Sequence, residues 1–463
     1  MASLAKRLAS WTYKLRYEDI PAEVVEETKK RVLDSFGVAI GAFFEEPPSI
    51  ARAYAMSTSS HKYGATIWGT THRSAPDHAT FANGCGVRYF DFNDTYLGKE
   101  ALHPSDNIPA ILAAAEMVDA DGKQVIEGIV VAYEIAGRLA DAYSIRAKGW
   151  DHVTYIAISS ALGAGKVLGL NEEQLTHAIN IALTTNNALR QTRAGELSMW
   201  KGCAAANSAR NGLFAAILAK NGMTGPAPVF EGEMGFFNIA IGGDKFNVPV
   251  LAGENGAGFK LLETSIKYWP VEYHAMSAVE AALKIREKAG NIKPEDIEEV
   301  FVKTFDVAYK IIVKDPEKWD PKTRETADHS LPYIIAAALL DGYVWMDTFR
   351  EQRILADDVR KVMSKMKVVV DEEHNKIYPT GIKNTIHVKL KDGREFEESS
   401  TYPPGHFKNP LDRHGVEAKF EKLVKGLLPK DAVKEIEARV WRLEQLDEVG
   451  KTLRLMKIVR EKS

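Results

Sequence analysis

Residues 79–118 consist of three consecutive segments, ATFANGCGVRYF, DFNDTYLGKEALHPSDN and IPAILAAAEMV. The outer two have the small and apolar residues of helices that neighbours must pack closely, which predicts a place at the centre of the protein. The middle segment, 91–107, is densely polar and contains Asp91, Asp94, Thr95, Lys99, Glu100 and His103. A simple connector between two helices does not require so many titratable groups, so we place the candidate chemistry here.

His103 is the most informative residue of this segment because it precedes Pro104. A proline pushes the residue before it toward an extended backbone. Ser105, Asp106 and Asn107 are all favourable N-cap residues, and Pro109 suits the first turn of a helix. We therefore expect His103 in a loop that faces a helix N-terminus, where free N–H groups can receive a carboxylate. The alternative is a solvated inter-helix loop that holds a histidine by chance.

Composition narrows the class of protein. The chain has 463 residues, which suggests two or more domains, and a formal net charge of -3 with 27% charged residues. This balance predicts no nucleic-acid partner and no anionic membrane surface as partner. No apolar run is long enough to span a bilayer, and the N-terminus lacks the apolar region of a secretory signal. We expect a cytoplasmic protein.

The sequence offers no ligand set for a metal. Its two cysteines, Cys85 and Cys203, cannot supply a zinc cluster of thiolates or the usual ligands of an iron–sulfur cluster. We predict that both are small buried packing residues. The segment GAGK at 163–166 is not a phosphate loop, because that motif requires glycine at Ser160 and a hydroxyl residue at Val167.

The pattern along the chain predicts a mainly α protein. Up to about residue 258 helical signals dominate, such as the spacing of Val25, Val32, Phe36 and Ile40. Strands are expected at 300–304, 367–370, 385–390 and 394–397, the last two joined by the turn Lys391-Asp392-Gly393. After Gly405 the pattern is helical again. We predict an all-helical domain formed by both chain ends, 1–265 and 405–463, with an inserted α+β domain at 266–404.

Six motifs together resemble the MmgE/PrpD family, which contains 2-methylcitrate dehydratase and cis-aconitate decarboxylase. They are RYFDFNDTYLGKEALHPSDNIPA (88–110), GWDHVTYIAISSALGAGKVLGL (149–170), GELSMWKGCAAANSARNG (195–212), SIKYWPVEYHAMSAVEAAL (265–283), RETADHSLPYIIAAALLDG (324–342) and STYPPGHFKNPL (400–411). The resemblance implies a helical domain with an inserted α+β lid, a homodimer, and a site without metal or cofactor.

The same motifs imply the site residues. The first gives Asp91, Thr95 and His103, and the next four give His152, Lys201, Lys267 and Tyr333. Thr95 would bind substrate, and the other six would be catalytic. To these we add Arg193 as a bidentate partner for a substrate carboxylate. Without the resemblance, His152 reads as an interior histidine, the two lysines as surface residues and Tyr333 as a core tyrosine.

The resemblance implies a cofactor-independent dehydratase that converts 2-methylcitrate to 2-methyl-aconitate in the methylcitrate cycle of propionate metabolism, with citrate as a second expected substrate. Such a reaction removes a proton α to a carboxylate and expels hydroxide, which must be protonated as it leaves. Either His103 is fixed by Asp91 and exchanges a proton with substrate, or Asp91 is the base and His103 the acid. The alternatives are a cis-aconitate decarboxylase, a polycarboxylate epimerase, and a non-catalytic scaffold that binds small acids.

Overall fold

The computed structural model describes residues 3–58, 63–195 and 197–459. The chain divides into two compact units, of which unit 1 comprises Met1–Ala194, Met199–Ser265 and Asp412–Ser463. Unit 2 comprises Gly195–Ser198 and Ile266–Leu411. Glu196, in the motif at 195–212, lies outside the described residues. Unit 1 is therefore built from both ends of the chain.

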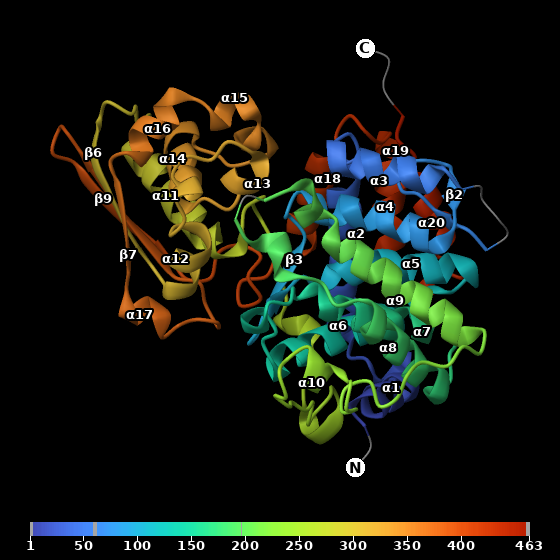
Figure 1. The fold of residues 1–463 in the computed structure, drawn as a ribbon. Coiled ribbons are helices and arrows are strands. Elements are labelled where there is room, and N and C mark those ends of the chain that lie inside the picture. Colours follow the sequence, from blue (N-terminus) through green and yellow to red (C-terminus); the bar gives the residue numbers. More distant parts are fainter. Residues whose placement is uncertain (1–2, 59–62, 196, 460–463) are drawn as a thin grey trace. The chain divides into compact units, whose positions relative to one another are not determined.

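Unit 1 is a bundle of helices (Figure 1). Its α-helices are α1 Leu4–Lys14, α2 Ala22–Gly41, α3 Glu46–Met56, α4 Pro76–Tyr89, α5 Ile108–Met117, α6 Gly122–Ala142, α7 Val153–Val167, α8 Glu172–Thr185, α9 Ala204–Lys220, α10 Phe236–Ile239, α18 Arg413–Val424, α19 Lys430–Val440 and α20 Gly450–Leu453. Asn171 caps α8 as part of a capping box with Gln174, which is a local sequence signal for the start of a helix.

The centre of unit 1 is formed by helices with small side chains, as predicted. All residues of α7 except Lys166 are buried, and α7 packs against α6 and α9. A Cβ atom on Gly84 of α4 would lie 2.7 Å from the Cβ of Ala206 in α9. Cys85 and Cys203 are buried in one cluster with Ala51 and Ala206, so the prediction that both are packing residues is confirmed. The GAGK segment lies inside α7, so it forms no phosphate loop.

Unit 1 is not all-helical, which corrects one detail of the predicted fold. Strands β1 Ala65–Thr66 and β2 Arg73–Ser74 pair antiparallel, as do β3 Asp94–Leu97 and β4 Ala101–Leu102. Strands of two to four residues contain too few alternations to give a period-two signal. The short β5, Ser265–Ile266, consists of the last residue of a unit 1 segment and the first residue of the main segment of unit 2.

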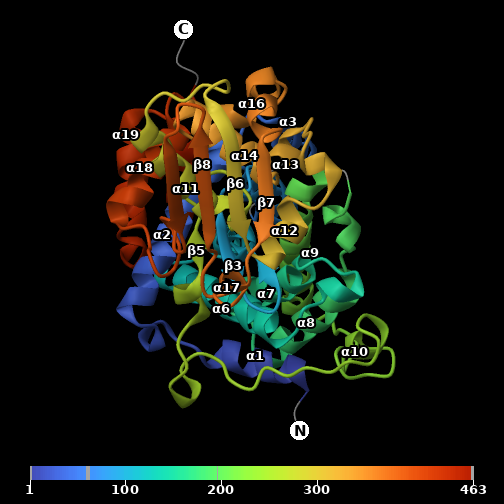
Figure 2. The ribbon, with the colours of Figure 1, turned by 90° about the vertical axis from the view of Figure 1, so that its left-hand side faces the viewer.

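Unit 2 is an α+β unit with one four-stranded sheet in the order β7-β6-β8-β9 (Figure 2). The strands are β6 Ile297–Thr304, β7 Met366–Val370, β8 Asn384–Leu390 and β9 Glu395–Ser400. Only the β6–β7 pair is parallel. Its helices are α11 Met276–Ala289, α12 Asp306–Ile312, α13 Arg324–Ala327, α14 Leu331–Asp341, α15 Glu351–Ile354, α16 Asp357–Met363 and α17 Glu372–Asn375.

Buried and half-exposed residues alternate along β8, so that one face of the sheet packs on the core of unit 2. Asn384, Ile386, Val388 and Leu390 of β8 are buried, while the residues between them are half-exposed. Helix α11 packs on β8 and β9. The predicted hairpin is confirmed, because β8 and β9 pair antiparallel around Gly393. The chain is thus mainly helical with small sheets, as predicted, whereas the predicted domain limits and the lid arrangement stay predictions.

The C-terminal segment of unit 1 is tied to the polar segment at 91–107 by a buried lysine. Lys419, on α18, lies 2.6 Å from Asp34 Oδ1 of α2 and donates a 2.7 Å hydrogen bond to the carbonyl of Phe92. Its ammonium nitrogen also lies 3.7 Å from the centre of the Phe92 ring. The last 50 or so residues therefore fix the backbone next to Asp91.

We expect Lys419→Met to destabilise the protein by about 3 kcal/mol, since removing one partner of a buried ion pair strands the other. Burial already raises the pKa of Asp34 despite Lys419, so Asp34 will take up a proton in this variant. The free energy of unfolding, measured with urea, checks the loss. Adding Asp34→Asn should recover part of it, and an equal or larger loss in the double variant would contradict this account.

Across the ranges that the structure describes, no helix has both the length and the apolar character needed to cross a membrane.

Candidate active site

A short hairpin carries the polar segment of unit 1. Tyr96 pairs with Leu102 and Leu97 with Ala101, so β3 and β4 form a ribbon that ends at His103. Gly98, in the turn between them, packs closely against α6, since a Cβ atom there would lie 2.5 Å from Asp141 Oδ1. His103 has an extended backbone with φ -121° and ψ 92°, as predicted for a residue before proline.

The residues after His103 do not cap a helix as predicted. Residues Pro104–Asn107 form a 3-10 turn, and α5 follows from Ile108 without a side-chain cap. Their groups bond other elements instead. Asp94 Oδ1 accepts from the N–H of Ser105 at 3.0 Å, and Asn107 Oδ1 accepts from Ser159 and Ser160 of α7. The predicted open helix N-terminus is therefore wrong, because the 3-10 turn leads directly into α5 and Asp94 of β3 already accepts from the N–H of Ser105.

Asp91 lies at a turn directly after α4. Its φ of 51° falls in the left-handed region, which is uncommon for a residue other than glycine. Its carboxylate forms an ion pair with Arg88, one helical turn earlier, and lies 3.4 Å from Lys201 Nζ. All three side chains are buried, with exposures of 3% or less. Within unit 1 the Asp91 carboxylate is therefore flanked by two cations.

Arg88, rather than Asp91, bonds the imidazole of His103. Arg88 Nη2 donates to His103 Nε2 at 2.9 Å, and arginine has no acceptor, so Nε2 carries no proton. His103 Nδ1 lies 2.6 Å from the carbonyl oxygen of Asp94 and must donate to it. Within unit 1 His103 is therefore neutral, with its proton on Nδ1. The hypothesis that Asp91 fixes the tautomer of His103 is wrong, because Arg88 lies between them.

His152 is held by a carboxylate that immediately precedes it in sequence. His152 Nδ1 lies 3.0 Å from Asp151 Oδ1, and the other carboxylate oxygen lies 2.9 Å from Arg193 Nε. Among the described residues none bonds His152 Nε2 or Arg193 Nη2, although both atoms are buried. An imidazole fixed through Nδ1 by a carboxylate, with Nε2 left for substrate, is the arrangement that activates a general base.

The charges of this pair follow from its surroundings. Burial, together with Arg193, Arg88 and Arg190, lowers the pKa of His152 well below its ordinary value, against the opposing effect of Asp151. Burial alone would raise the pKa of Asp151, but Arg193, His152 and Arg190 lower it below its ordinary value. At neutral pH His152 is therefore a neutral base and Asp151 an anion that accepts its Nδ1 proton.

Unit 1 brings six of the eight predicted site residues into one network of buried and half-buried side chains. The rings of His103 and His152 lie 5.6 Å apart between centroids, in an edge-to-face arrangement. Thr95 Oγ1 lies 3.2 Å from His103 Nδ1. The chain of contacts runs through Lys201, Asp91, Arg88, His103, His152, Asp151 and Arg193. Arg193 binds Asp151 through Nε, so its predicted bidentate contact with substrate would have to use its terminal nitrogens.

The other two predicted residues, Lys267 and Tyr333, belong to unit 2. Both are fully buried, so neither lysine of the prediction, Lys201 or Lys267, is a surface residue. The Tyr333 hydroxyl donates a 2.5 Å hydrogen bond to the carbonyl of Thr348, and burial raises its pKa. This is the environment of a core tyrosine, and a catalytic role for Tyr333 stays a prediction.

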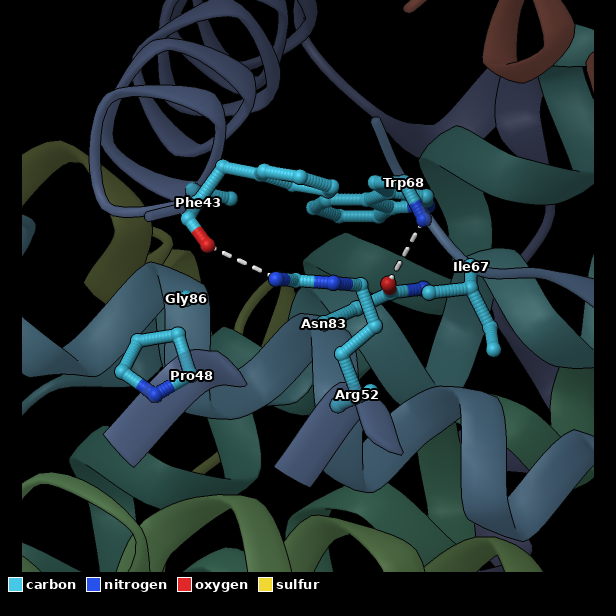
Figure 3. A pocket seen from close by; sticks show the side chains of 9 residues that line it. Phe43, Pro48, Arg52, Ile67, Trp68, Asn83 and Gly86 are labelled. Carbon is cyan, nitrogen blue, oxygen red and sulfur yellow. Dashed lines mark hydrogen bonds between the residues drawn. The ribbon is translucent and has the colours of Figure 1, made fainter. Parts of the chain in front are cut away.

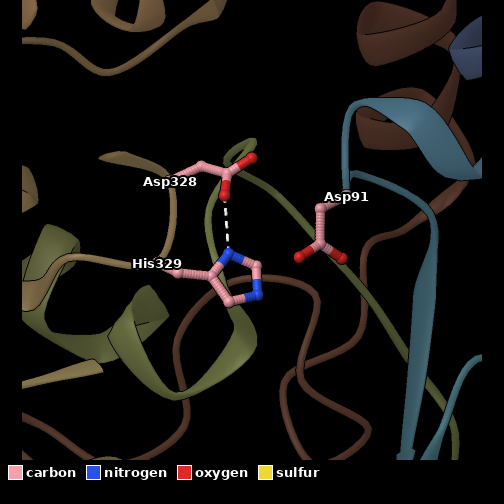
Figure 4. Close-up of side chains that lie close together, drawn as sticks. All are labelled: Asp91, Asp328 and His329. Atoms are coloured by element: carbon pink, nitrogen blue, oxygen red, sulfur yellow. Dashed lines mark hydrogen bonds and ion pairs between the residues drawn. The ribbon is translucent and has the colours of Figure 1, made fainter. Parts of the chain in front are cut away.

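Unit 2 also contains two pairs of histidine and carboxylate that the sequence did not assign. Asp328 Oδ1 lies 2.5 Å from His329 Nδ1, and Glu272 Oε1 lies 2.7 Å from His274 Nδ1 (Figure 4 for the first pair). The N–H of Glu272 donates to the carbonyl of Asp328, which links the two pairs. Despite burial, His274, His329 and Lys267 lower the pKa of Glu272 to about 2. The pairs lie within the motifs at 265–283 and 324–342.

A separate pocket of about 260 Å³ in unit 1 contains no predicted site residue (Figure 3). The polar side chains that line it, Arg52 and Asn83, already have partners within the protein. Arg52 stacks 3.6 Å above the ring centre of Phe43 and donates to the Phe43 carbonyl. Asn83 accepts from the N–H of Trp68 and donates to the carbonyl of Thr66. The pocket therefore reads as part of the packing between α2, α3 and α4.

Sequence reasoning missed Arg88 and Asp151 as parts of the network. Arg88 was visible as the residue three positions before Asp91, which is one helical turn. Asp151 was visible as a carboxylate next to His152, but adjacent residues in sequence seldom face each other, so the pair needed the bend before α7. The contact of Arg193 with Asp151 joins residues 42 positions apart and has no local signal.

Comparisons with known proteins agree with the motifs. Residues 6–249 match the MmgE/PrpD N-terminal domain, and residues 269–445 match the MmgE/PrpD C-terminal domain. The chain is 30% identical to the 2-methylcitrate dehydratase of Salmonella typhimurium over 370 residues, which cover 75% of each chain. It is 29% identical to a mitochondrial 2-methylcitrate dehydratase of Yarrowia lipolytica over 394 residues, covering 81% of this chain and 75% of the relative.

A relative with a different activity is nearly as similar. The cis-aconitate decarboxylase of Mus musculus is 27% identical over 484 aligned positions, covering 99% of this chain and 94% of the relative. The likeness therefore spans both units and includes relatives named for two different reactions. The resemblance drawn from the six motifs is confirmed, and the chain belongs to the MmgE/PrpD family.

Proposed function

We propose that this protein is a lyase that dehydrates 2-methylcitrate to 2-methyl-aconitate without a cofactor, with citrate as a second substrate. The observation that carries the proposal is the buried pair of Asp151 and His152, whose Nε2 has no partner among the described residues, next to the network around His103. The relatives named 2-methylcitrate dehydratase support this choice of reaction.

In this proposal His152 removes the proton. It is neutral at neutral pH, its tautomer is set by Asp151, and its free Nε2 can accept a proton from the carbon α to a substrate carboxylate. Moving a proton to His152 creates an imidazolium beside the Asp151 anion, which stabilises it. Asp151 is therefore a positioning residue that acts through His152.

The negative charge that develops on the substrate requires cations. Arg193 has a buried terminal nitrogen without a partner in the described chain, and Arg88 and Lys201 surround Asp91. Guanidinium and ammonium groups held in the interior stabilise an enolate-like carboxylate more strongly than they would in water. We assign Arg193 to a substrate carboxylate, with Thr95 as a further hydrogen-bonding group beside His103.

Hydroxide leaves from the neighbouring carbon and must take up a proton. In our proposal His103 provides it from Nε2. As the trianionic substrate draws Arg88 away from this nitrogen, Nε2 takes up a proton from solvent, and the imidazolium, whose ring lies next to that of His152, gives that proton to the leaving hydroxide. The Asp91 carboxylate and its two cations, Arg88 and Lys201, then balance the change of charge at the neighbouring His103. The second reading keeps His103 as the acid but makes Asp91, rather than His152, the base; it predicts that Asp91→Asn abolishes proton removal while His152→Gln does not.

A substrate panel tests the reaction. Purified protein would be incubated with 2-methylcitrate, citrate and cis-aconitate, while the unsaturated product and released carbon dioxide are followed together. We expect an unsaturated tricarboxylate from 2-methylcitrate and no carbon dioxide. Carbon dioxide from cis-aconitate would identify a decarboxylase, interconversion of stereoisomers an epimerase, and binding without turnover a scaffold. The scaffold is disfavoured because the titratable site residues of unit 1 are buried or half-buried and in contact with one another rather than exposed and dispersed.

We expect activity to survive treatment with a chelator, because the sequence provides two cysteines and no clustered histidine motif for a metal. Turnover of 2-methylcitrate before and after chelation and gel filtration is the measurement. Loss of activity that a single divalent metal restores would contradict the prediction.

The homodimer and the cytoplasmic location stay predictions from the sequence and the family resemblance. Light scattering at micromolar concentration would test the dimer.

A further inference from the structure

Asp106 is a buried carboxyl group that the proposed reaction does not use. It lies three residues after His103 in the turn Pro104–Asn107, and it is 2% exposed. Its Oδ1 accepts a 3.1 Å hydrogen bond from Asn93 Nδ2. No described residue bonds its Oδ2, which is also buried. An ionised carboxylate in this position is costly, so Asp106 requires either a proton or nearby positive charge.

The charged groups around this turn come from several elements. Those that act most strongly on Asp106 are Arg88 of α4, Asp94 of β3 and Arg193. Asp94 in turn interacts with Asp34 of α2 and with Tyr133 of α6, and Arg31 of α2 acts on both of these groups. Tyr133 donates to Asp94.

Burial has the largest effect on the pKa of Asp106. It raises the pKa of Asp106 to about 7, with a further contribution from Asp94, against the opposing effects of Arg88, Arg193 and Asn93. Near neutral pH this carboxyl therefore exchanges its proton readily. The same two guanidiniums, Arg88 and Arg193, lie at His103 and at the Asp151–His152 pair.

We propose that Asp106 takes up a proton when the substrate binds, so that it is neutral in the tricarboxylate complex. The inference rests on the proposed function, which places a tricarboxylate at His103, His152 and Arg193. A trianion drawn to Arg193 and Arg88 competes with ionised Asp106 for the same two cations. Like charges in a buried site repel strongly, and a proton on Asp106 removes the repulsion.

The direction of the pH effect follows from linkage. Because the complex holds the protonated form, tricarboxylate affinity is highest below the pKa of free Asp106 and falls as pH rises through about 7. Above that value the dissociation constant should increase toward about tenfold per pH unit, and near pH 7 binding should take up about half a proton. Asp106→Asn mimics the neutral carboxyl, so its affinity should lose this pH dependence.

Calorimetry measures the proton directly. Tricarballylate is a suitable probe because it has three carboxylates but no hydroxyl group to eliminate. Its binding would be titrated from below to above neutrality in two buffers that differ in ionisation enthalpy, with wild type, Asp106→Asn and Glu116→Gln. Glu116 is a matched control: it is also buried with a raised pKa, but both of its oxygens are bonded to Thr66.

We expect wild type and Glu116→Gln to take up the same fraction of a proton, and Asp106→Asn to take up less by about half a proton near pH 7. Protons that tricarballylate itself gains or loses on binding are the same for both proteins, so they cancel when the uptake by Asp106→Asn is subtracted from that by wild type. Equal uptake by wild type and Asp106→Asn would overturn the inference but leave the proposed function standing. Wild type that binds neither tricarballylate nor 2-methylcitrate would overturn both.

If Asp106→Asn does not fold, infrared difference spectra of the wild type test whether Asp106 takes up a proton. Tricarballylate added above neutrality should create the C=O band of one protonated carboxyl group in the protein. A difference spectrum without that band would overturn the inference.

Discussion

His103→Ala is expected to lower kcat for 2-methylcitrate by about a hundredfold or more, the usual effect of losing a general acid or base. His103 contacts Arg88, Thr95 and Asp94, and it stands 5.6 Å from His152 between ring centres. Its removal therefore takes away the proton donor of the proposed reaction and leaves Arg88 with Asp91. Steady-state kinetics with the folded variant give the measurement.

The matched control is His177→Ala. His177 lies on α8, accepts a 3.2 Å hydrogen bond from the N–H of Gly225 and is remote from the network in sequence and contacts. We expect kcat near that of wild type. Both variants should keep most of their stability, because each loses side-chain hydrogen bonds worth about 1 kcal/mol apiece rather than core packing. Wild-type turnover in His103→Ala together with an inactive, folded His177→Ala would show that the site is wrongly assigned.

Asp151→Asn is expected to lower kcat by about a hundredfold to ten-thousandfold, although Asp151 itself would not touch the substrate. The amide that replaces the carboxylate can present a donor to His152 Nδ1. The imidazole proton then moves to Nε2, where it blocks proton removal. The loss should appear in kcat more than in KM, because the substrate carboxylates remain bound by the cations.

The pH profile separates this role from a merely structural one. Asp151 raises the pKa of His152 against the larger effect of burial, so its removal lowers that pKa further. A base must be unprotonated, so the remaining activity rises with pH through the pKa of His152. The acidic limb of kcat/KM should therefore move to lower pH in Asp151→Asn. Asp244→Asn, at an exposed ion pair with Lys148, should change neither kcat nor the limb. An unmoved limb in Asp151→Asn would rule out action through His152.

Local patterns were sufficient for the elements that local interactions decide. The extended backbone of His103 follows from Pro104, the start of α8 follows from the Asn171 capping box, and the β8–β9 hairpin follows from alternation around Lys391-Asp392-Gly393. The density of titratable residues at 91–107 pointed to the part of unit 1 that holds the network around His103. Each of these signals lies within a few residues of the feature that it predicts.

Local patterns failed where a group had several possible partners. Ser105, Asp106 and Asn107 are favourable N-cap residues, yet in the fold their groups bond Asp94, Asn93 and the α7 serines. Asp91 was expected to bond His103, and Arg88 takes that place because it lies three residues before Asp91, near the end of α4, and contacts both residues. The hairpin of β3 and β4 was too short to show alternation.

The sequence by itself determined the family, the mainly helical class and the residues from which the site would be drawn, because motifs and periodicities are properties of contiguous segments. Only the tertiary structure decided how those residues are paired and charged. Lys201 meets Asp91 across 110 positions, Arg193 meets Asp151 across 42, and Lys419 reaches Phe92 across 327. Burial and the sum of nearby charges, which set the protonation of His152 and Asp106, exist only once these distant segments are packed together.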